Sequence, residues 1–301
     1  MTSTDPDSNV EAVHEIYPDG DILLVCGPNK VVLLIHSIFL TNASKVFAAM
    51  LNGNFREGQP QANGGRRTIP LPEDDPFAME CICASLHSRN ERLPNSMTPK
   101  QLLAIAYAAD KYDLVSSLRI ISSHWFSANK ATQSSFHIED FWSTMAAAYI
   151  LKDDDFFRST TATIVLNHDQ SFLGLDQLAG NIVPSEITLS LEEKRNSVRL
   201  ALMQLLYRQA YITPNDCSCM ESSRCTCGWN AQHCYEYMQK LGSTELLPEK
   251  ISRTALHSVF TTMALMHQKF NLGLYFVTKL DELLKSCGIS LDAFEQAEGY
   301  L

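Results

Sequence analysis

The most informative part of the sequence is residues 21–58, DILLVCGPNKVVLLIHSIFLTNASKVFAAMLNGNFREG, because its hydrophobic period changes in a fixed order. Two apolar runs, residues 22–26 and 31–35, flank a Gly-Pro-Asn-Lys turn, a pattern that predicts the two strands of a hairpin. After His36 the apolar residues follow a period of 3.6, which indicates helix. The predicted buried helical stripe consists of Ile38, Leu40, Val46, Phe47, Met50 and Leu51.

A polar cluster, residues 41–44, divides this helical stretch into two pieces. Ser44 is the best candidate to cap the second piece, because a serine oxygen can accept a hydrogen bond from the first turn of a helix. The stretch therefore predicts strand, tight turn, strand, and two short helices.

These motifs resemble the BTB/POZ interaction domain, and the order of the chain as a whole resembles the BTB proteins of fungi. The matching residues in the first stretch are Asp21, His36, Leu40, Ser44 and Phe47. Downstream, residues 68–71 are similar to the family's third strand, 76–87 to its next helix, and 102–114 to its closing helix pair.

The resemblance implies an α+β fold for residues 19–127, preceded by a flexible tail over residues 1–18. It also implies that His36 is a buried structural histidine near the carboxylate of Asp21. An all-helical domain is expected over residues 128–301, where no internal repeat is evident.

Helical spacing of apolar residues recurs throughout this C-terminal part, and prolines fall between the segments, where they stop helices. The predicted helices span residues 136–150, 156–166, 191–211, 231–241, 254–270 and 272–287. In the third of these, we expect an apolar face at Val198, Ala201, Leu202, Leu205 and Leu206. The charged residues 192–195, Arg199 and Arg208 are expected mostly on the solvated side.

Composition and charge restrict the class of protein. The chain has 301 residues, 45% hydrophobic content and a formal net charge of -10, which predicts folded domains and disfavours unspecific binding to nucleic acid. No apolar run reaches the length needed to cross a bilayer, and residues 1–9 carry no signal-peptide pattern. We therefore expect a cytoplasmic or nuclear protein without a membrane partner.

Five of the nine cysteines lie in a cysteine-rich loop over residues 216–234. Cys217, Cys219, Cys225 and Cys227, with His233 or Cys234 as an alternate, could close on one structural zinc, because thiolates and imidazoles bind that metal tetrahedrally. Two other interpretations stay open. The cysteines are reduced loop residues without a metal, or they form disulfides, although a cytosolic compartment keeps thiols reduced.

The sequence favours a protein that is not an enzyme. No phosphate-binding glycine loop, HExxH helix or GxSxG elbow occurs in the sequence. Three consecutive aspartates, residues 153–155, precede an apolar helical segment, and acidic residues at that place favour a helix start over a metal site.

The sequence thus predicts an interaction scaffold that uses a BTB domain for homo- or hetero-association. A weak homodimer would use the first helices, with Ile38, Phe39 and Ala43 near the contact. The first alternative is a substrate adaptor for a cullin-type ubiquitin ligase, with Tyr112 and Leu114 as partner contacts. The second is a zinc-binding regulatory protein built on the cysteine cluster.

Overall fold

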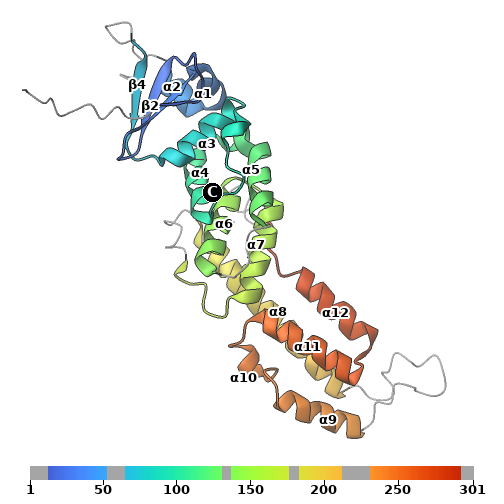
Figure 1. The fold of residues 1–301 in the computed structure, drawn as a ribbon. Helices are drawn as coiled ribbons and strands as arrows, with labels where there is room; N and C mark the ends of the chain where they lie inside the picture. Colours follow the sequence, from blue (N-terminus) through green and yellow to red (C-terminus); the bar gives the residue numbers. More distant parts are fainter. Residues whose placement is uncertain (1–12, 53–64, 131–136, 176–182, 212–230, 293–301) are drawn as a thin grey trace, which may run out of the picture. The chain divides into compact units, whose positions relative to one another are not determined.

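The computed structural model describes residues 13–52, 65–130, 137–175, 183–211 and 231–292. The chain divides into two compact units (Figure 1). The first unit consists of residues 1–135 and 146–156, and the second of residues 136–145 and 157–301. The chain is α+β, with a small four-stranded sheet near its N-terminus followed by helices.

The sheet of the first unit has the strand order β1-β3-β2-β4. Strands β2 (Ile22–Cys26) and β3 (Val31–Ile35) form the predicted antiparallel hairpin, with Ile22 opposite Ile35. Strand β4 (Arg67–Leu71) pairs in parallel with β2 and contains the predicted third strand. Both faces of the hairpin pack, because every side chain in its two strands is buried or half-buried.

The flexible tail predicted over residues 1–18 is wrong for residues 13–16. Strand β1 (Val13–Glu15) pairs in parallel with β3, and Ile16 is buried directly after it. The backbone amide of Ile16 donates to the carbonyl of Leu34 at 3.0 Å, which extends the attachment beyond the strand. A three-residue strand is too short to give an alternating pattern, so the sequence did not indicate it.

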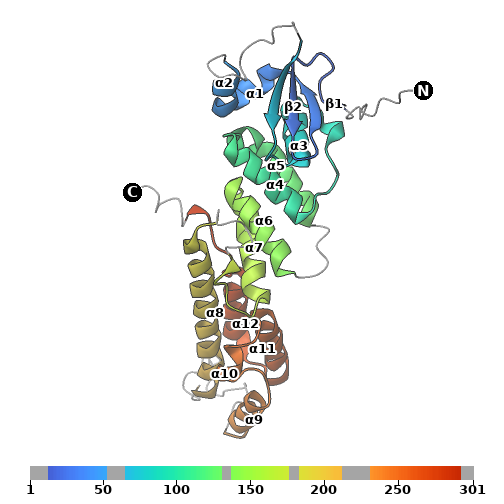
Figure 2. The same cartoon turned by 90° about the vertical axis from the view of Figure 1, so that its left-hand side faces the viewer.

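Five helices and a 3-10 turn follow or separate these strands between residues 37 and 130. They are α1 (Ser37–Ala43), α2 (Lys45–Leu51), α3 (Pro76–Leu86), η2 (Asn90–Arg92), α4 (Pro99–Lys111) and α5 (Val115–Lys130). Helix α3 packs against β3 and against α4 and α5, while α1 and α2 pack on each other beside the sheet (Figure 2). Asp75 caps α3 and Thr98 caps α4 through side-chain hydrogen bonds.

The predicted helical stripe of α1 and α2 is correct in part. Leu40, Phe47 and Leu51 are buried, whereas Ile38 and Val46 are 47% and 38% exposed. The break between two seven-residue helices resets the helical phase, so a single stripe cannot continue from one helix to the other.

The described helices beyond α5 correspond to the predicted segments, except that α8 begins at Ser185 instead of residue 191 and one short helix is additional. They are α6 (Ile138–Ile150), α7 (Asp154–Asn167), α8 (Ser185–Tyr211), α9 (Ala231–Gly242), α10 (Pro248–Ile251), α11 (Leu256–Phe270) and α12 (Gly273–Lys285). The aspartates before α7 act as predicted, because the Asp153 carboxylate accepts from the backbone amide of Phe156 at 3.0 Å. None of the described helices is long and apolar enough to cross a membrane.

Helices α8, α11 and α12 pack together in the second unit (Figure 1). The apolar face predicted for α8 is buried at Val198, Leu202, Leu205 and Leu206, with Ala201 half-buried. The solvated position predicted for the charged residues is wrong for Arg195 and Arg199, which are only 4% and 7% exposed.

Candidate interaction site

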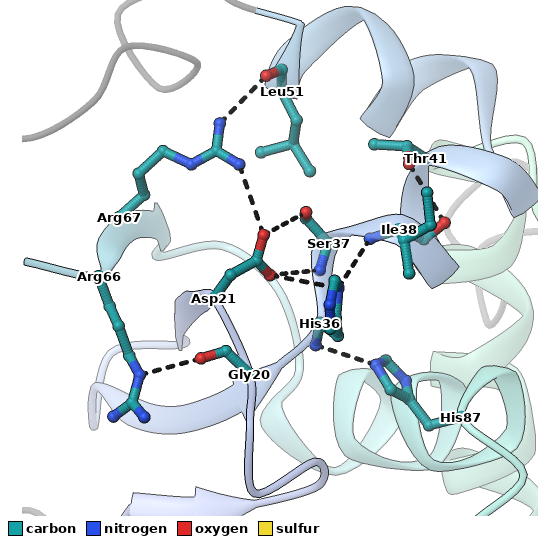
Figure 3. Close-up of polar contacts among 10 residues, drawn as sticks. All are labelled: Gly20, Asp21, His36, Ser37, Ile38, Thr41, Leu51, Arg66, Arg67 and His87. Carbon is teal, nitrogen blue, oxygen red and sulfur yellow. Dashed lines mark hydrogen bonds and ion pairs between the residues drawn. The ribbon is translucent and has the colours of Figure 1, made fainter.

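The start of α1 is held by the carboxylate of Asp21, immediately before β2 (Figure 3). Its two oxygens accept from the backbone amide and the hydroxyl of Ser37, both at 2.6 Å. Burial disfavours the charged carboxylate, but the hydrogen bonds from Ser37 outweigh it, so the pKa of Asp21 lies below its ordinary value. A negative charge at this place also stabilises the first turn of the helix.

His36 caps the same helix, and it is not the buried histidine that was predicted. Its Nδ1 lies 3.6 Å from Asp21 Oδ1, so the two residues are close, but its side chain is 38% exposed. The buried histidine is His87, whose Nε2 accepts from the backbone amide of His36 at 3.1 Å and whose Nδ1 lies 2.7 Å from the carbonyl oxygen of Cys83. Burial lowers the pKa of His87, which favours its neutral form.

Two arginines at the start of β4 join this network (Figure 3). Arg67 Nη1 donates to the carbonyl of Leu51 at 3.2 Å, and its Nη2 lies 3.9 Å from Asp21 Oδ2. Arg66 Nε donates to the carbonyl of Gly20 at 2.9 Å. Together the two side chains connect the end of α2 and the residues before β2 to β4.

Asp21, His36 and Ser37 do not form a nucleophile and base pair. A serine nucleophile needs a base that accepts its hydroxyl proton. The Ser37 hydroxyl instead donates to the Asp21 carboxylate, while His36 Nδ1 accepts from the backbone amide of Ile38 at 3.4 Å. The three side chains therefore position α1.

A cluster of rings, three of them half-exposed and His87 buried, lies beside α1. Phe39 is 4.4 Å from the ring of His87 and 5.9 Å from that of Tyr17, measured between centroids. The guanidinium of Arg89 lies 5.6 Å from the centroid of Tyr17. Phe39, one of the predicted dimer contacts, is thus fixed by neighbouring rings and keeps part of its surface exposed.

The other two predicted dimer contacts lie on the same helix. Ile38 is exposed, whereas Ala43 is half-buried and its carbonyl accepts from the hydroxyl of Ser117 on α5 at 3.1 Å. Val46 on α2 is a further exposed aliphatic residue, which was wrongly assigned to the core.

Ser44 caps α2 as predicted and also connects it to the turn between α4 and α5. Its hydroxyl oxygen accepts from the backbone amide of Phe47 at 3.0 Å, and its hydroxyl donates to the carbonyl of Tyr112. The rings of Phe47 and Tyr112 stack with their centroids 4.4 Å apart. Asp74 accepts from the Tyr112 hydroxyl at 2.7 Å and from Lys111 Nζ at 2.8 Å.

The predicted partner contacts Tyr112 and Leu114 are wrong as surface anchors. Tyr112 is 3% exposed, Leu114 is fully buried, and burial together with Asp74 raises the pKa of the Tyr112 hydroxyl. Both side chains belong to the core of the first unit, because the turn after α4 points them inward. A partner protein cannot reach them without unfolding that turn.

The cysteine cluster lies largely outside the described residues. Cys217, Cys219, Cys225 and Cys227 are not described, whereas the alternates His233 and Cys234 lie in the first turn of α9, exposed and half-buried. Among the described residues, no group of three or more His, Cys, Asp and Glu side chains is arranged to hold a metal. The zinc interpretation therefore stays a prediction.

Tyr17, Asp74 and His87 were not among the predicted site residues. Each joins segments far apart in sequence, such as the 51 positions between His36 and His87. Their roles follow from tertiary packing, and no local spacing rule would have identified them.

Comparison of the chain with protein-family models, with curated proteins and with solved structures found no match.

Proposed function

We propose that the first unit is a BTB/POZ-like protein-interaction module that associates through the outer face of α1 and α2. Support comes from the order of its elements, in which a hairpin, two short helices, a third strand and three longer helices follow the order that the sequence motifs predict. The resemblance at Asp21, Ser44 and Phe47 belongs to this same framework.

The main support for the proposal is that α1 and α2 each carry both buried and exposed apolar side chains. Leu40 and Phe47 are fully buried on one side, while Ile38 and Val46 are 47% and 38% exposed on the other. Exposed aliphatic side chains on helices that are rigidly held by their own core provide preformed contacts for a partner. Phe39, next to Ile38 in α1, also keeps part of its surface exposed.

The partner that we propose is a second copy of this chain. A contact of two short helices with each other buries an area at the low end of the specific range, about 1,200 Å² in total. Such an interface gives a weak dimer, in which the aromatic and aliphatic side chains of α1 supply most of the binding energy. Association with a different protein through the same face is the alternative form of this function.

Recruitment of a cullin-type scaffold is the less favoured proposal. It depended on Tyr112 and Leu114 as surface anchors, and both side chains are buried. A contact without an apolar anchor lacks its main source of affinity.

Sedimentation velocity of the full chain tests the proposed dimer. We expect the parent protein to dimerise at tens of micromolar, and the double variant Ile38→Asp plus Val46→Asp to be monomeric, because burying two carboxylates against a partner is costly. The control is Ile120→Asp, which changes a 91% exposed residue of α5 and should leave the dimer intact.

A parent protein that stays monomeric would remove homodimerisation from the proposal. If the control dissociates and the double variant does not, the interface lies on α5 and the face of α1 and α2 has been misassigned. Circular dichroism of all three variants verifies that each remains folded.

A further inference from the structure

An open hollow lies between helices α8 and α12 of the second unit. Its volume is about 490 Å³, within the range of about 300 to 1,000 Å³ that is usual for small-molecule sites. Such sites often lie between the helices of a bundle. The lining residues that decide what the hollow can bind are Leu205, Arg208, Tyr275, Lys279, Glu282 and Leu283.

Part of the lining is apolar and remains open to water, because α12 packs incompletely on its neighbours. In the whole of this helix only Phe276 is buried. Leu283 is half-buried and Tyr275 is 46% exposed, and both line the hollow together with Leu205 of α8. Covering such surface with the apolar part of a ligand is favourable, roughly in proportion to the area removed from water.

Three charged side chains line the hollow, and two of them neutralise each other. Lys279 Nζ donates to Glu282 Oε2 at 2.6 Å. The third is Arg208, whose guanidinium lies 4.4 Å from the centroid of the Tyr275 ring. Among the described residues, no carboxylate forms an ion pair with Arg208. The lining therefore carries one positive charge without a counter-ion.

The contact with Tyr275 leaves the hydrogen-bond donors of Arg208 available. A guanidinium has five N–H donors in its own plane, and its contact with an aromatic ring does not use them. Within the part of the chain that the structure describes, no atom accepts a hydrogen bond from Arg208. A carboxylate can accept from two of these donors at once, which makes it a suitable partner.

We propose that the hollow between α8 and α12 binds a small amphiphilic monocarboxylate. Its carboxylate pairs with Arg208, and its apolar part packs against Tyr275, Leu205 and Leu283. A bare inorganic anion would leave the apolar lining in water, and a neutral apolar ligand would leave Arg208 without a counter-ion. Glu282 in the same lining disfavours a ligand with several negative charges, because like charges repel. The proposal does not depend on the association face of α1 and α2.

Calorimetric titration of the full chain tests the site with three probes. Phenylbutyrate has both a ring and a charge, phenylbutyramide has the same shape without the charge, and butyrate has the charge without the ring. We expect phenylbutyrate to bind at least about 10-fold more tightly than either of the others, because the charge-assisted hydrogen bond and the covered ring each contribute a factor of that order.

Arg208→Gln separates the charge from the apolar contacts. It should weaken phenylbutyrate binding by about 10- to 100-fold, to the affinity of the amide, and leave binding of the amide unchanged. Arg208 is exposed, so its replacement should not unfold α8. The control is Arg253→Gln, which changes an exposed arginine of the same unit outside the lining of the hollow.

A second pair of variants tests the contribution of the ring. Tyr275→Ala should weaken binding of phenylbutyrate and of the amide alike, whereas Tyr275→Phe, which keeps the ring, should preserve both. Absence of phenylbutyrate binding up to about 10 mM, above the millimolar range of weak sites, would overturn the proposal. Equal affinity of the parent for phenylbutyrate and the amide would overturn the carboxylate as the ligand class. Unchanged affinity in both Arg208→Gln and Tyr275→Ala would place the bound probe elsewhere on the chain and refute the site.

Discussion

Replacing Phe47 by alanine tests the packing of the first unit. Phe47 is fully buried and stacks on Tyr112 with an interplanar angle of 19°. Truncation of a buried phenylalanine costs about 3 to 5 kcal/mol. We expect the upper part of this range, because the stacked ring pair contributes about 0.5 to 1.5 kcal/mol beyond its buried area.

The loss is large relative to the stability of a domain, which is about 5 to 15 kcal/mol. At about 4 °C per kcal/mol for a domain of this size, Phe47→Ala should lower the melting temperature of the first unit by about 16 to 20 °C. Differential scanning calorimetry of the full chain is the suitable assay, because it can separate the transitions of two units.

Val46→Ala is the matched control on the same helix. Val46 is 38% exposed, so its truncation should change stability by about 0.5 kcal/mol or less. Similar melting of Phe47→Ala and the parent protein would refute the buried position of Phe47. A control as unstable as Phe47→Ala would show that α2 turns its other face inward.

Three further predictions concern Asp21, Glu192 and the cysteine cluster. Because the pKa of Asp21 is lowered in the folded protein, its carboxylate contributes to stability above the unfolded pKa of about 3.8, and this contribution is lost as the pH falls through the lower folded pKa. Asp21→Asn removes this contribution at every pH. The melting temperature of the variant should therefore fall less than that of the parent between about pH 6 and pH 3. Glu192→Gln should destabilise the second unit by about 3 kcal/mol in urea unfolding, since it leaves the buried Arg195 without its ion pair; an unchanged midpoint would contradict this. If the cysteine cluster binds zinc, elemental analysis should find about one zinc per chain, and replacing Cys225 and Cys227 together should remove it and lower stability.

Local patterns predicted the elements of this fold well. The hairpin strands at residues 22–26 and 31–35 were placed correctly, because uninterrupted apolar runs bounded by turn residues leave few alternatives. Ser44 was identified as a helix cap for a similar reason, since capping depends on residues adjacent in sequence. The three-residue β1 was missed, because it is too short for a period to be measured.

The main error of the prediction from sequence was the exposure of charged residues on α8. Arg195 and Arg199 were assigned to the solvated side of α8 because a mixed run of charged residues usually forms the solvated side of a packed helix. Their positions share one helical face with Leu191, Val198 and Leu202, so helical spacing alone would have placed them inward. The prediction gave more weight to the charge of these residues than to their helical spacing.

The candidate interaction site was predictable only at the level of its helices. The sequence identified Ile38, Phe39 and Ala43 as neighbours on one helix, but not their different exposures. Tyr112 was misassigned because its burial depends on Phe47 and Asp74, which lie 65 and 38 positions away in sequence. Contacts over such separations are set by the assembled core and leave no spacing pattern in the chain.

The position of β1 has a consequence for the solubility of shortened forms of the protein. This strand covers the outer edge of β3, whose sequence VVLLI is entirely aliphatic. A chain that began at Asp19 would leave the backbone amides and carbonyls of that edge without partners. Unprotected aliphatic edges pair with other molecules and start aggregation. Residues 13–16 should therefore protect the sheet edge from pairing with other copies of the chain. A variant that lacks them should become turbid in solution before it loses helical structure.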